Sequence, residues 1–395
     1  MLMHRKHQLI VLCAALAFGE ALGALSPACA EAWPVAAGLA LLVLLFGYGL
    51  SLPGWRIVCV SLLGLVLFYR STLAQEQLYR EKPWLRHARR HQQSLDDSAP
   101  PWLAEIRRDV SRRLGLGLDH DRELVSLNRA ILLGERNDLP RRTRRMFVDA
   151  GTIHVFAISG LHVMIVAWTL VYLLLVCRIP FRAAGLAALP MLWGYVVLIG
   201  MPPSAVRAAL MASFYFTAPL FWRRPDMLVA WELTFLAVHA VRPENIANVG
   251  SLLSFTVMFA ILFVARAFRN RPTRVQRLAV ALAAWAAGVP IAAHVFGRVT
   301  PGGLLANVAL LPAAGVTVVT GVLGLVTSYA SETAAAHLNN VSALFTRAMT
   351  EVSRAVAALP GANFATRPWS YAECALWYAA MFLVLAAFKS RRHPF

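Results

Sequence analysis

Three polar side chains, His154, Ser159 and His162, interrupt an otherwise apolar stretch of the sequence. Nucleophilic catalysis needs a nucleophile and a base held within reach of each other, and no motif here supplies such a pair. We therefore predict no catalytic residue. Placed on one helix, the three side chains share a face, and Gly160 lets a neighbouring helix approach closely. The simpler alternative is that His162 satisfies a hydrogen bond inside a helix bundle.

Four more polar residues lie in apolar segments further along the chain: Ser204, Arg207, Glu232 and His239. A charge at the centre of a membrane helix costs at least ~2.5 kcal/mol, so Arg207 should face a cavity, a partner or the interface. Snorkelling to the nearby surface is the alternative. Glu232 and His239 are expected to pair with Arg207 or to line the same cavity, unless they only hydrogen-bond helix to helix.

The composition places the chain in a membrane. Its 395 residues are 58% hydrophobic, and 15% are Asp, Glu, Lys or Arg, against roughly 25% charged residues in a soluble domain. A helix needs about 20 apolar residues to cross the hydrocarbon core, and it pairs all of its backbone polar groups internally. We predict an all-α fold, a polytopic transmembrane helix bundle of about 10–11 spans with amphipathic interfacial helices.

The chain divides into four parts. Residues 1–75 are predicted to hold N-terminal transmembrane helices, the first of them an uncleaved signal-like span and the others near 34–50 and 56–73. Residues 76–150 form a polar region, 151–330 a dense membrane region, and 331–395 an amphipathic helix and a final span. The later spans are expected near 153–177, 183–200, 204–221, 227–241, 250–268, 278–296, 303–329 and 371–388.

Residues 303–329 look irregular. They contain Pro312 and several glycines, which favour a kinked or broken helix lining a cavity. Asn307 is polar within this apolar segment and is expected to help seal the break. The stretch 333–358 that follows has the pattern of an amphipathic helix.

The polar region contains one clear amphipathic helix, over 101–114. Apolar residues recur there at helical spacing, and the other face carries Arg107, Arg108, Arg112 and Arg113. This is the pattern of a helix at a membrane surface, although packing on protein would also explain it. The sequence has 38 basic against 20 acidic residues. This excess of positive charge has two explanations: part of it binds a polyanion, or the basic residues mark cytoplasmic loops.

The arginines of the short loops indicate an orientation. Nine lie in loops predicted to be cytoplasmic (178–182, 222–226 and 266–277), and two, Arg242 and Arg298, lie in outer loops. The positive-inside rule then places residues 76–150 in the periplasm. The five cysteines have no metal-ligand or redox spacing, so we predict no metal and no cofactor.

Several sequence blocks resemble one family. The Ala-Ile-Ser-Gly-Leu-His-Val string at 157–163 is similar to the signature of ComEC-type competence proteins, and the Asn128-to-Arg136 stretch resembles its lead-in. Further similar blocks follow in the same order, at Ser204-Ala-Val-Arg207, at Ser251-Leu-Leu-Ser254-Phe255 and from Leu304 to Pro312. Four ordered blocks across about 200 residues make the resemblance specific.

The resemblance implies a bacterial inner-membrane, multi-pass channel that passes single-stranded DNA into the cell during natural competence. On this interpretation the pore or gating candidates are His154, Ser159, Gly160, His162, Ser204, Arg207, Glu232, His239 and Asn307. The nucleic-acid-binding candidates are Arg107, Arg108, Arg112 and Arg113. The implied partners are single-stranded DNA and the lipid bilayer.

The sequence also departs from the family pattern. Full-length members carry an oligonucleotide-binding barrel and a metallo-β-lactamase-like domain, and neither is expected in this sequence, which has no His-x-His-x-Asp-His cluster. A separate competence ATPase, DNA receptor or hydrolase would then supply the missing functions. A small-solute secondary transporter and a non-transporting scaffold paralogue remain alternatives to the channel.

Overall fold

The computed structural model describes residues 100–118, 121–135, 139–155, 158–241 and 248–390. The predicted N-terminal spans of 1–75 and the first part of the polar region lie outside them. The α-helices are α5 (Pro101–Arg113), α6 (Arg122–Leu133), α7 (Arg141–Asp149), α8 (Gly160–Val176), α9 (Phe181–Leu198), α10 (Pro203–Thr217), α11 (Met227–Val241), α12 (Val249–Ala267), α13 (Thr273–Phe296), α14 (Gly302–Thr327), α15 (Glu332–Ala357) and α16 (Tyr371–Ser390). Short turns η2 (Ile153–Val155) and η3 (Ala218–Phe221) and strands β1 (Arg298–Val299) and β2 (Phe364–Ala365) complete them. The all-α prediction is confirmed.

Four of these helices, α9, α12, α13 and α14, are long and apolar enough to cross a membrane, and α8 and α11 are shorter apolar helices. About a third or less of each long span is buried within the protein. The rest presents large apolar side chains outward, as on α14, where Leu305 and Val308 are 62% and 68% exposed. Such side chains are stable where the surrounding solvent is hydrocarbon.

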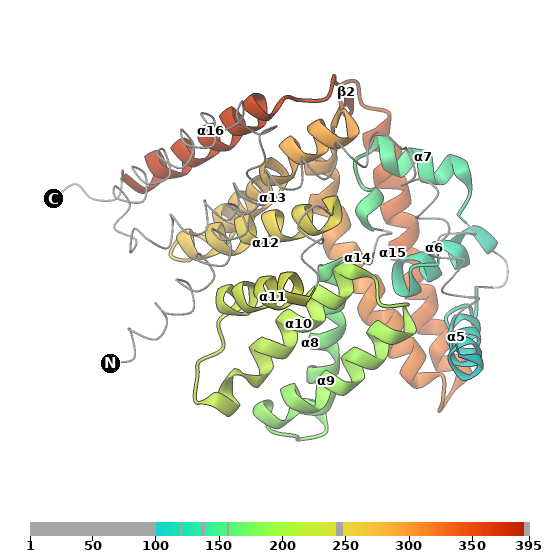
Figure 1. Ribbon diagram of the computed structural model, residues 1–395. Coiled ribbons are helices and arrows are strands. Elements are labelled where there is room, and N and C mark those ends of the chain that lie inside the picture. The colour runs from blue at the N-terminus through green and yellow to red at the C-terminus, as the bar shows by residue number, and fades with distance from the viewer. Residues whose placement is uncertain (1–99, 119–120, 136–138, 156–157, 242–247, 391–395) are drawn as a thin grey trace.

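The helices form two groups around α8 and α14 (Figure 1). In one group, α8, α9 and α10 pack together and lead to α11 and to the α12–α13 pair, with α16 against α13. In the other, α14 and α15 form a long antiparallel hairpin, against which α5, α6 and α7 pack. The paired strands β1 and β2, with Arg298 opposite Ala365, join the end of α13 to the chain after α15.

Helix α14 is continuous over its 26 residues, with Pro312 inside it. Of the kinked or broken helix predicted for 303–329, the break is therefore wrong, and the kink stays a prediction. The glycines that suggested the break serve close packing instead. A Cβ at Gly321 would lie 2.5 Å from a terminal carbon of Leu132 in α6, and one at Gly324 would lie 2.8 Å from Oδ1 of Asn339 in α15. Asn307 therefore seals no break.

Helix α15 confirms the helix predicted at 333–358, but the face it buries is largely polar. Asn128 of α6 accepts hydrogen bonds from Thr346 Oγ1 at 2.6 Å and from Ser342 Oγ at 3.4 Å. Near the other end, the hydroxyls of Thr152 and Ser353 lie 3.2 Å apart. Small polar side chains let two backbones approach and then bond across the gap. This packing fixes α6 and η2 on the hairpin.

The amphipathic helix predicted at 101–114 is α5. It ends at Arg113, with Leu114 as the C-cap residue, and its apolar residue Val110 is buried. Helix α6 ends at Gly134, whose positive φ of 74° is typical of a glycine that terminates a helix. Tyr195 of α9 then donates to the Leu132 carbonyl oxygen at 2.9 Å, which ties the membrane helices to α6.

Candidate functional site

Helix α8 begins at Gly160, so the prediction that His154, Ser159 and His162 share one helical face is wrong. Ser159 is the N-cap residue, and His154 lies in the preceding turn η2. The His162 ring folds back onto the cap: the Ser159 N–H donates to His162 Nδ1 at 3.2 Å, and Ser159 Oγ lies 2.9 Å from the same nitrogen. A serine N-cap favours the start of a helix at this point, because its side chain offers the first unpaired backbone amides of the helix a local partner.

This geometry fixes the protonation of His162. Since Nδ1 accepts the Ser159 amide proton, the neutral ring carries its hydrogen on Nε2. That nitrogen is buried and has no hydrogen-bond partner among the described residues, and the residue is 2% exposed. A buried N–H without a partner is costly, so a water molecule or a transported group is the natural acceptor.

Three other predicted residues lie near this cap. Ser204 Oγ donates to the Ile158 carbonyl oxygen at 2.6 Å, which joins α10 to the chain just before α8. The side chain of Asn307 lies beside the His154 ring, and His154 is close enough to His162 for the two rings to interact electrostatically. The starts of α8, α10 and α14 thus bring together residues that are up to 153 positions apart in the sequence.

Gly160 sits where α8 meets α10. A Cβ at this position would lie 3.5 Å from the Cβ of Ala208, which is ordinary van der Waals contact. Helices α8 and α10 are therefore in contact at Gly160, at a distance that leaves room for one methyl group and does not require a glycine. Ala208 itself is 4% exposed, so a larger side chain at position 160 would meet a buried residue on this side.

Arg207 lies one helical turn after Ser204 and is 6% exposed, so the alternative in which it snorkels to the surface is wrong. Its Nη2 donates to the Gly250 carbonyl oxygen at 3.0 Å, and its guanidinium lies 5.7 Å from the centre of the Phe255 ring. A cation over an aromatic face gains electrostatic energy that partly offsets burial. Arg207 is therefore held between α10 and the start of α12.

His239 of α11 belongs to the same cluster. Its ring lies 4.1 Å from the Phe235 ring and 5.4 Å from the Phe255 ring, and it interacts electrostatically with Arg207. His239 Nδ1 lies 2.7 Å from the Phe235 carbonyl oxygen. Glu232 is half-buried on the same helix, two turns earlier. His239 thus lies near Arg207, and its Nδ1 contact is made within α11. The expected pairing of Glu232 and His239 with Arg207, or a cavity that they line together, stays a prediction.

Four buried polar atoms at or beside these clusters lack a hydrogen-bond partner among the described residues: His162 Nε2, Arg207 Nε, Ser251 Oγ and Asn307 Oδ1. Native interiors leave few such atoms, and each is a position where water or a ligand binds. They lie on α8, α10, α12 and α14. This arrangement can hydrate a path or contact a polar solute.

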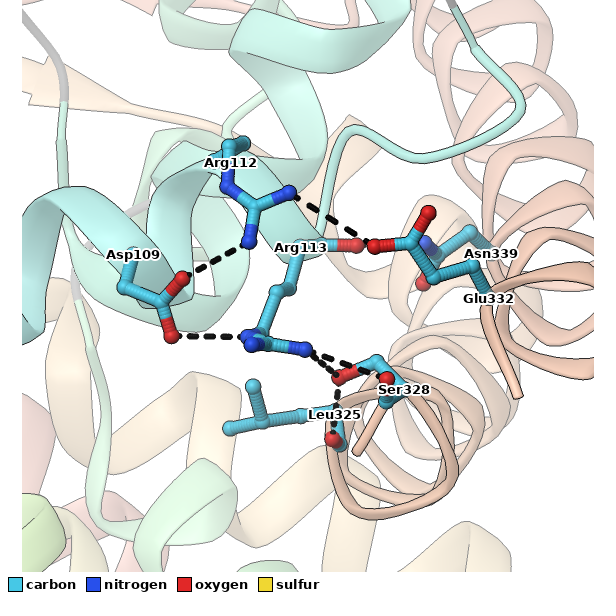
Figure 2. A network of polar contacts seen from close by, with 7 residues as sticks. All are labelled: Asp109, Arg112, Arg113, Leu325, Ser328, Glu332 and Asn339. Carbon is cyan, nitrogen blue, oxygen red and sulfur yellow. Dashed lines mark hydrogen bonds and ion pairs between the residues drawn. The ribbon is translucent and has the colours of Figure 1, made fainter. Parts of the chain in front are cut away.

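The arginines of α5 have different surroundings, which Figure 2 shows for Arg112 and Arg113. Arg113 Nε donates to Asp109 at 2.7 Å, and its Nη1 lies 3.1 Å from the Ser328 carbonyl oxygen. Its guanidinium also covers the Tyr329 ring at 4.1 Å. These contacts anchor α5 on the turn between α14 and α15. Hydrogen bonds from Arg113, and then from Arg112, hold the pKa of Asp109 below its ordinary value.

Arg112 is more exposed and bridges two acids. Its Nη2 lies 2.9 Å from Asp109, and its Nη1 lies 3.7 Å from Glu332 at the start of α15. Arg107 Nε donates to the Leu198 carbonyl oxygen at 2.6 Å, which places this residue at the end of α9. Arg108 is exposed, and its Nε lies 3.4 Å from the carbonyl oxygen of Ala104 within the same helix.

A cavity of about 680 Å³ opens between α5 and α6, and its lining includes Arg107, Arg108, Arg112 and Arg129. Arg129 belongs to the Asn128-to-Arg136 stretch and was not among the predicted nucleic-acid-binding residues. Arg129 Nε donates to the Ser111 carbonyl oxygen at 3.1 Å. Its position in the cavity depends on how α6 packs against α5, which helical periodicity alone does not reveal.

The part of the chain that the structure describes contains no group of three or more His, Cys, Asp or Glu side chains that could hold a metal ion. The described cysteines, Cys177 and Cys374, are free thiols. The site therefore consists of buried polar groups inside the helix bundle and a basic cavity beside it.

Comparisons with known proteins agree on one family. The model of a family described as "Competence protein" matches residues 131–391. A ComE operon protein 3 from Bacillus subtilis (strain 168) is 29% identical over 184 residues, which cover 46% of this chain and 24% of that protein. Competence protein ComA from Neisseria gonorrhoeae is 32% identical over 179 residues, which cover 42% of this chain and 24% of that protein.

An uncharacterised protein from Aquifex aeolicus (strain VF5) is 30% identical over 211 residues, which cover 53% of this chain and 49% of that protein. The chain thus aligns with a quarter to a half of the length of these relatives. No solved structure matches. The matched range begins in α6 and continues through every later helix that the structure describes.

Proposed function

Because the chain belongs to the competence protein family, we propose that it forms the inner-membrane channel component through which single-stranded DNA enters a bacterium in natural competence. The observation that carries the proposal is the extent of the family match, which takes in both polar clusters and all of the apolar helices described. The chain is a membrane protein. A multi-pass arrangement in the inner membrane belongs to the proposal.

In this channel the pore or gate is formed by two clusters of polar residues on α8, α10, α12 and α14. The first cluster lies around His162 at the start of α8, and the second lies around Arg207, between α10 and the start of α12. His162 Nε2 and Arg207 Nε are buried donors without a partner among the described residues, which suits groups that meet water or phosphate in passing. Ser159, Ser204 and Gly160 set the geometry of the helix starts that carry them. His154 and Asn307 border the first cluster, and His239 belongs to the second, which Glu232 borders.

The channel transports DNA without changing its covalent structure. Its chemistry is hydrogen bonding and charge, and a separate competence ATPase, DNA receptor or hydrolase provides the driving force and strand processing. Residues 151–330 make up the channel domain, 76–150 a periplasmic region that receives the strand, and 331–395 the closing helices. The N-terminal spans of 1–75 complete the membrane part.

The test is transformation of a strain that lacks this gene. Complementation with the wild-type chain should restore both transformants and nuclease-protected, single-stranded labelled DNA inside the cell. Complementation with Arg207→Met at equal membrane abundance should restore neither, because the buried donor is lost. A strain that transforms normally without the gene would refute the channel and leave a solute transporter or a scaffold.

The orientation is tested separately by labelling single introduced cysteines in intact cells. With a membrane-impermeant reagent, a cysteine at Arg144 in the polar region should react, and one at Arg271 in the 266–277 loop should not. A reactive 271 position would reverse the assignment made from the loop arginines.

A further inference from the structure

We propose that the cavity between α5 and α6 binds the phosphodiester backbone of a single-stranded nucleic acid. This inference rests on the proposed function, and it adds a site with defined walls to a helix that the sequence marks only as basic. The cavity holds about 680 Å³, within the range of roughly 300–1,000 Å³ that is usual for small-ligand sites. This volume suits a nucleotide unit of a strand better than an isolated ion.

The lining is strongly positive. Four arginines face one acid, Glu135, which gives a formal charge of +3 from +4 and −1. Guanidinium groups bind phosphate oxygens with paired, parallel N–H donors, so arginine is the residue expected in a phosphate site. A formal charge of +3 exceeds what one lipid headgroup neutralises, whereas a strand brings a further charge with every nucleotide.

The cavity is also held in shape before any ligand arrives. Arg129 is fixed by its hydrogen bond to the Ser111 carbonyl oxygen, and Ser111 Oγ in turn lies 3.2 Å from Glu135. On the far side of α5, Arg113 and Asn339 hold the helix on α14 and α15 (Figure 2). An orientation fixed in advance lowers the entropy lost on binding.

The lining lacks aromatic side chains among the described residues, and its larger apolar members are Leu116 and Val125. Base stacking therefore contributes little, and recognition falls on the backbone. We expect oligo(dT) and oligo(dA) to bind with similar affinity, in contrast to sites built on aromatic platforms, where stacking adds to every base.

The experiment measures binding of fluorescent 20-nucleotide oligo(dT) to the purified full chain in detergent across a salt series. Arg108→Gln should weaken binding and reduce the slope of log K against log salt by about 0.7, the value for one lost contact to a single strand. Arg129→Gln should do the same or more. Arg144→Gln, an exposed arginine of α7 outside the cavity, is the matched control and should leave the slope unchanged.

A further variant distinguishes binding in the cavity from a general effect of positive surface charge. Ala104→Phe fills part of the cavity without altering any charge, so it should weaken oligonucleotide binding at every salt concentration while leaving the slope per contact unaffected. It also guards against misfolding of Arg129→Gln, whose lost hydrogen bond touches α5. Equal effects of Arg108→Gln and Arg144→Gln, together with normal binding by Ala104→Phe, would overturn the proposal.

The same variants distinguish a cavity that binds lipid headgroups from one that binds a nucleic acid strand. If Arg108→Gln and Ala104→Phe release the protein from phosphatidylglycerol headgroups, measured with soluble short-chain lipid, and leave oligo(dT) binding intact, the cavity is a lipid site and the proposal fails. The channel function is judged only by transformation of the deletion strain. Unchanged oligonucleotide binding by the cavity variants, together with loss of transformation in the deletion strain, would therefore refute the cavity and leave the channel standing.

Discussion

The side-chain amide of Asn339 donates to two carbonyl oxygens at the end of α5: Nδ2 lies 2.8 Å from Arg113 O and 3.1 Å from Leu116 O. The last carbonyls of a helix have no partner within the helix and must find one elsewhere. Here that partner comes from α15, more than 220 residues later in the chain, and it is 1% exposed. Asn339 thereby caps the basic helix and fixes it on the α14–α15 hairpin.

Asn339→Ala should destabilise the protein. It removes the Asn339 donor from the Leu116 carbonyl oxygen and from that of Arg113, which keeps the Leu116 N–H at 3.3 Å, and an unsatisfied buried group costs about 1–3 kcal/mol. The free energy of unfolding, measured by denaturant titration in mixed micelles, is expected to fall by an amount in this range. Asn340→Ala, at the exposed neighbouring position of the same helix, provides the control. Equal losses in the two variants would contradict the capping role.

Two glycines of the membrane helices should respond in opposite ways to alanine. At Gly321 the new methyl group would meet the Leu132 side chain at 2.5 Å, whereas at Gly194 nothing lies within 4 Å. Overpacking of this kind costs about 1–3 kcal/mol, while alanine in an open helical position gains up to about 1 kcal/mol over glycine. In micelles, the free energy of unfolding of Gly321→Ala should be lower than that of the wild type. That of Gly194→Ala should be equal to the wild-type value or higher.

Helix α5 was predictable from sequence because its determinants are local. Leu103, Ile106, Val110 and Leu114 recur with helical period, and glycines follow them. The unbroken α14 was not predictable in the same way. A glycine in an apolar helix is equally consistent with a break and with close packing, and only the position of Leu132 beside Gly321 decides between them. That contact depends on the tertiary fold.

Attachment of α5 should depend on pH. The folded-state pKa of Asp109 is lowered, first by its hydrogen bond to Arg113 and then by that to Arg112, relative to an unfolded value of about 3.9. Its contribution to stability is therefore present above about pH 4 and is lost as the pH falls through the folded-state pKa. Hydrogen exchange of α5 amides, corrected for the intrinsic rate, should accelerate below pH 4.

Asp109→Asn tests the origin of this effect. The amide cannot ionise, so α5 in the variant should exchange faster than in the wild type at pH 7 and should show no further acceleration of this origin in acid. An acid response that is the same in both proteins would assign it to other groups.

The polar membrane residues were predictable as a set, because a charge or an imidazole in an apolar segment is unusual wherever it lies. Their grouping was not. Arg207 and His239 both lie against Phe255, a residue of the Ser251-to-Phe255 block for which no role was predicted. Ser159 could have been identified as a helix cap from its type, since serine is a preferred N-cap residue. The apolar run on both sides of it concealed the boundary.

The last prediction concerns the contact between Gly160 and Ala208, where α8 meets α10. A methyl group at position 160 would lie in ordinary contact, 3.5 Å from the Ala208 Cβ, so Gly160→Ala should transform at close to the wild-type frequency. Gly160→Leu adds three further carbons against a residue that is 4% exposed. We expect it to separate the helices, displace the Ser159 cap with His162, and abolish DNA uptake.

The measurement is transformation frequency in the deletion strain, with membrane abundance of each variant matched by immunoblot so that lost folding is not mistaken for lost transport. Ser159→Ala serves for comparison. It removes one hydroxyl contact to His162 while the Ser159 N–H bond to Nδ1 is retained, and one such intramembrane hydrogen bond is worth about 0.6 kcal/mol on average. Its effect should therefore be mild. Normal uptake by Gly160→Leu at equal abundance would show that the α8–α10 contact does not control the path, and the assignment of the first cluster to the pore would have to be withdrawn.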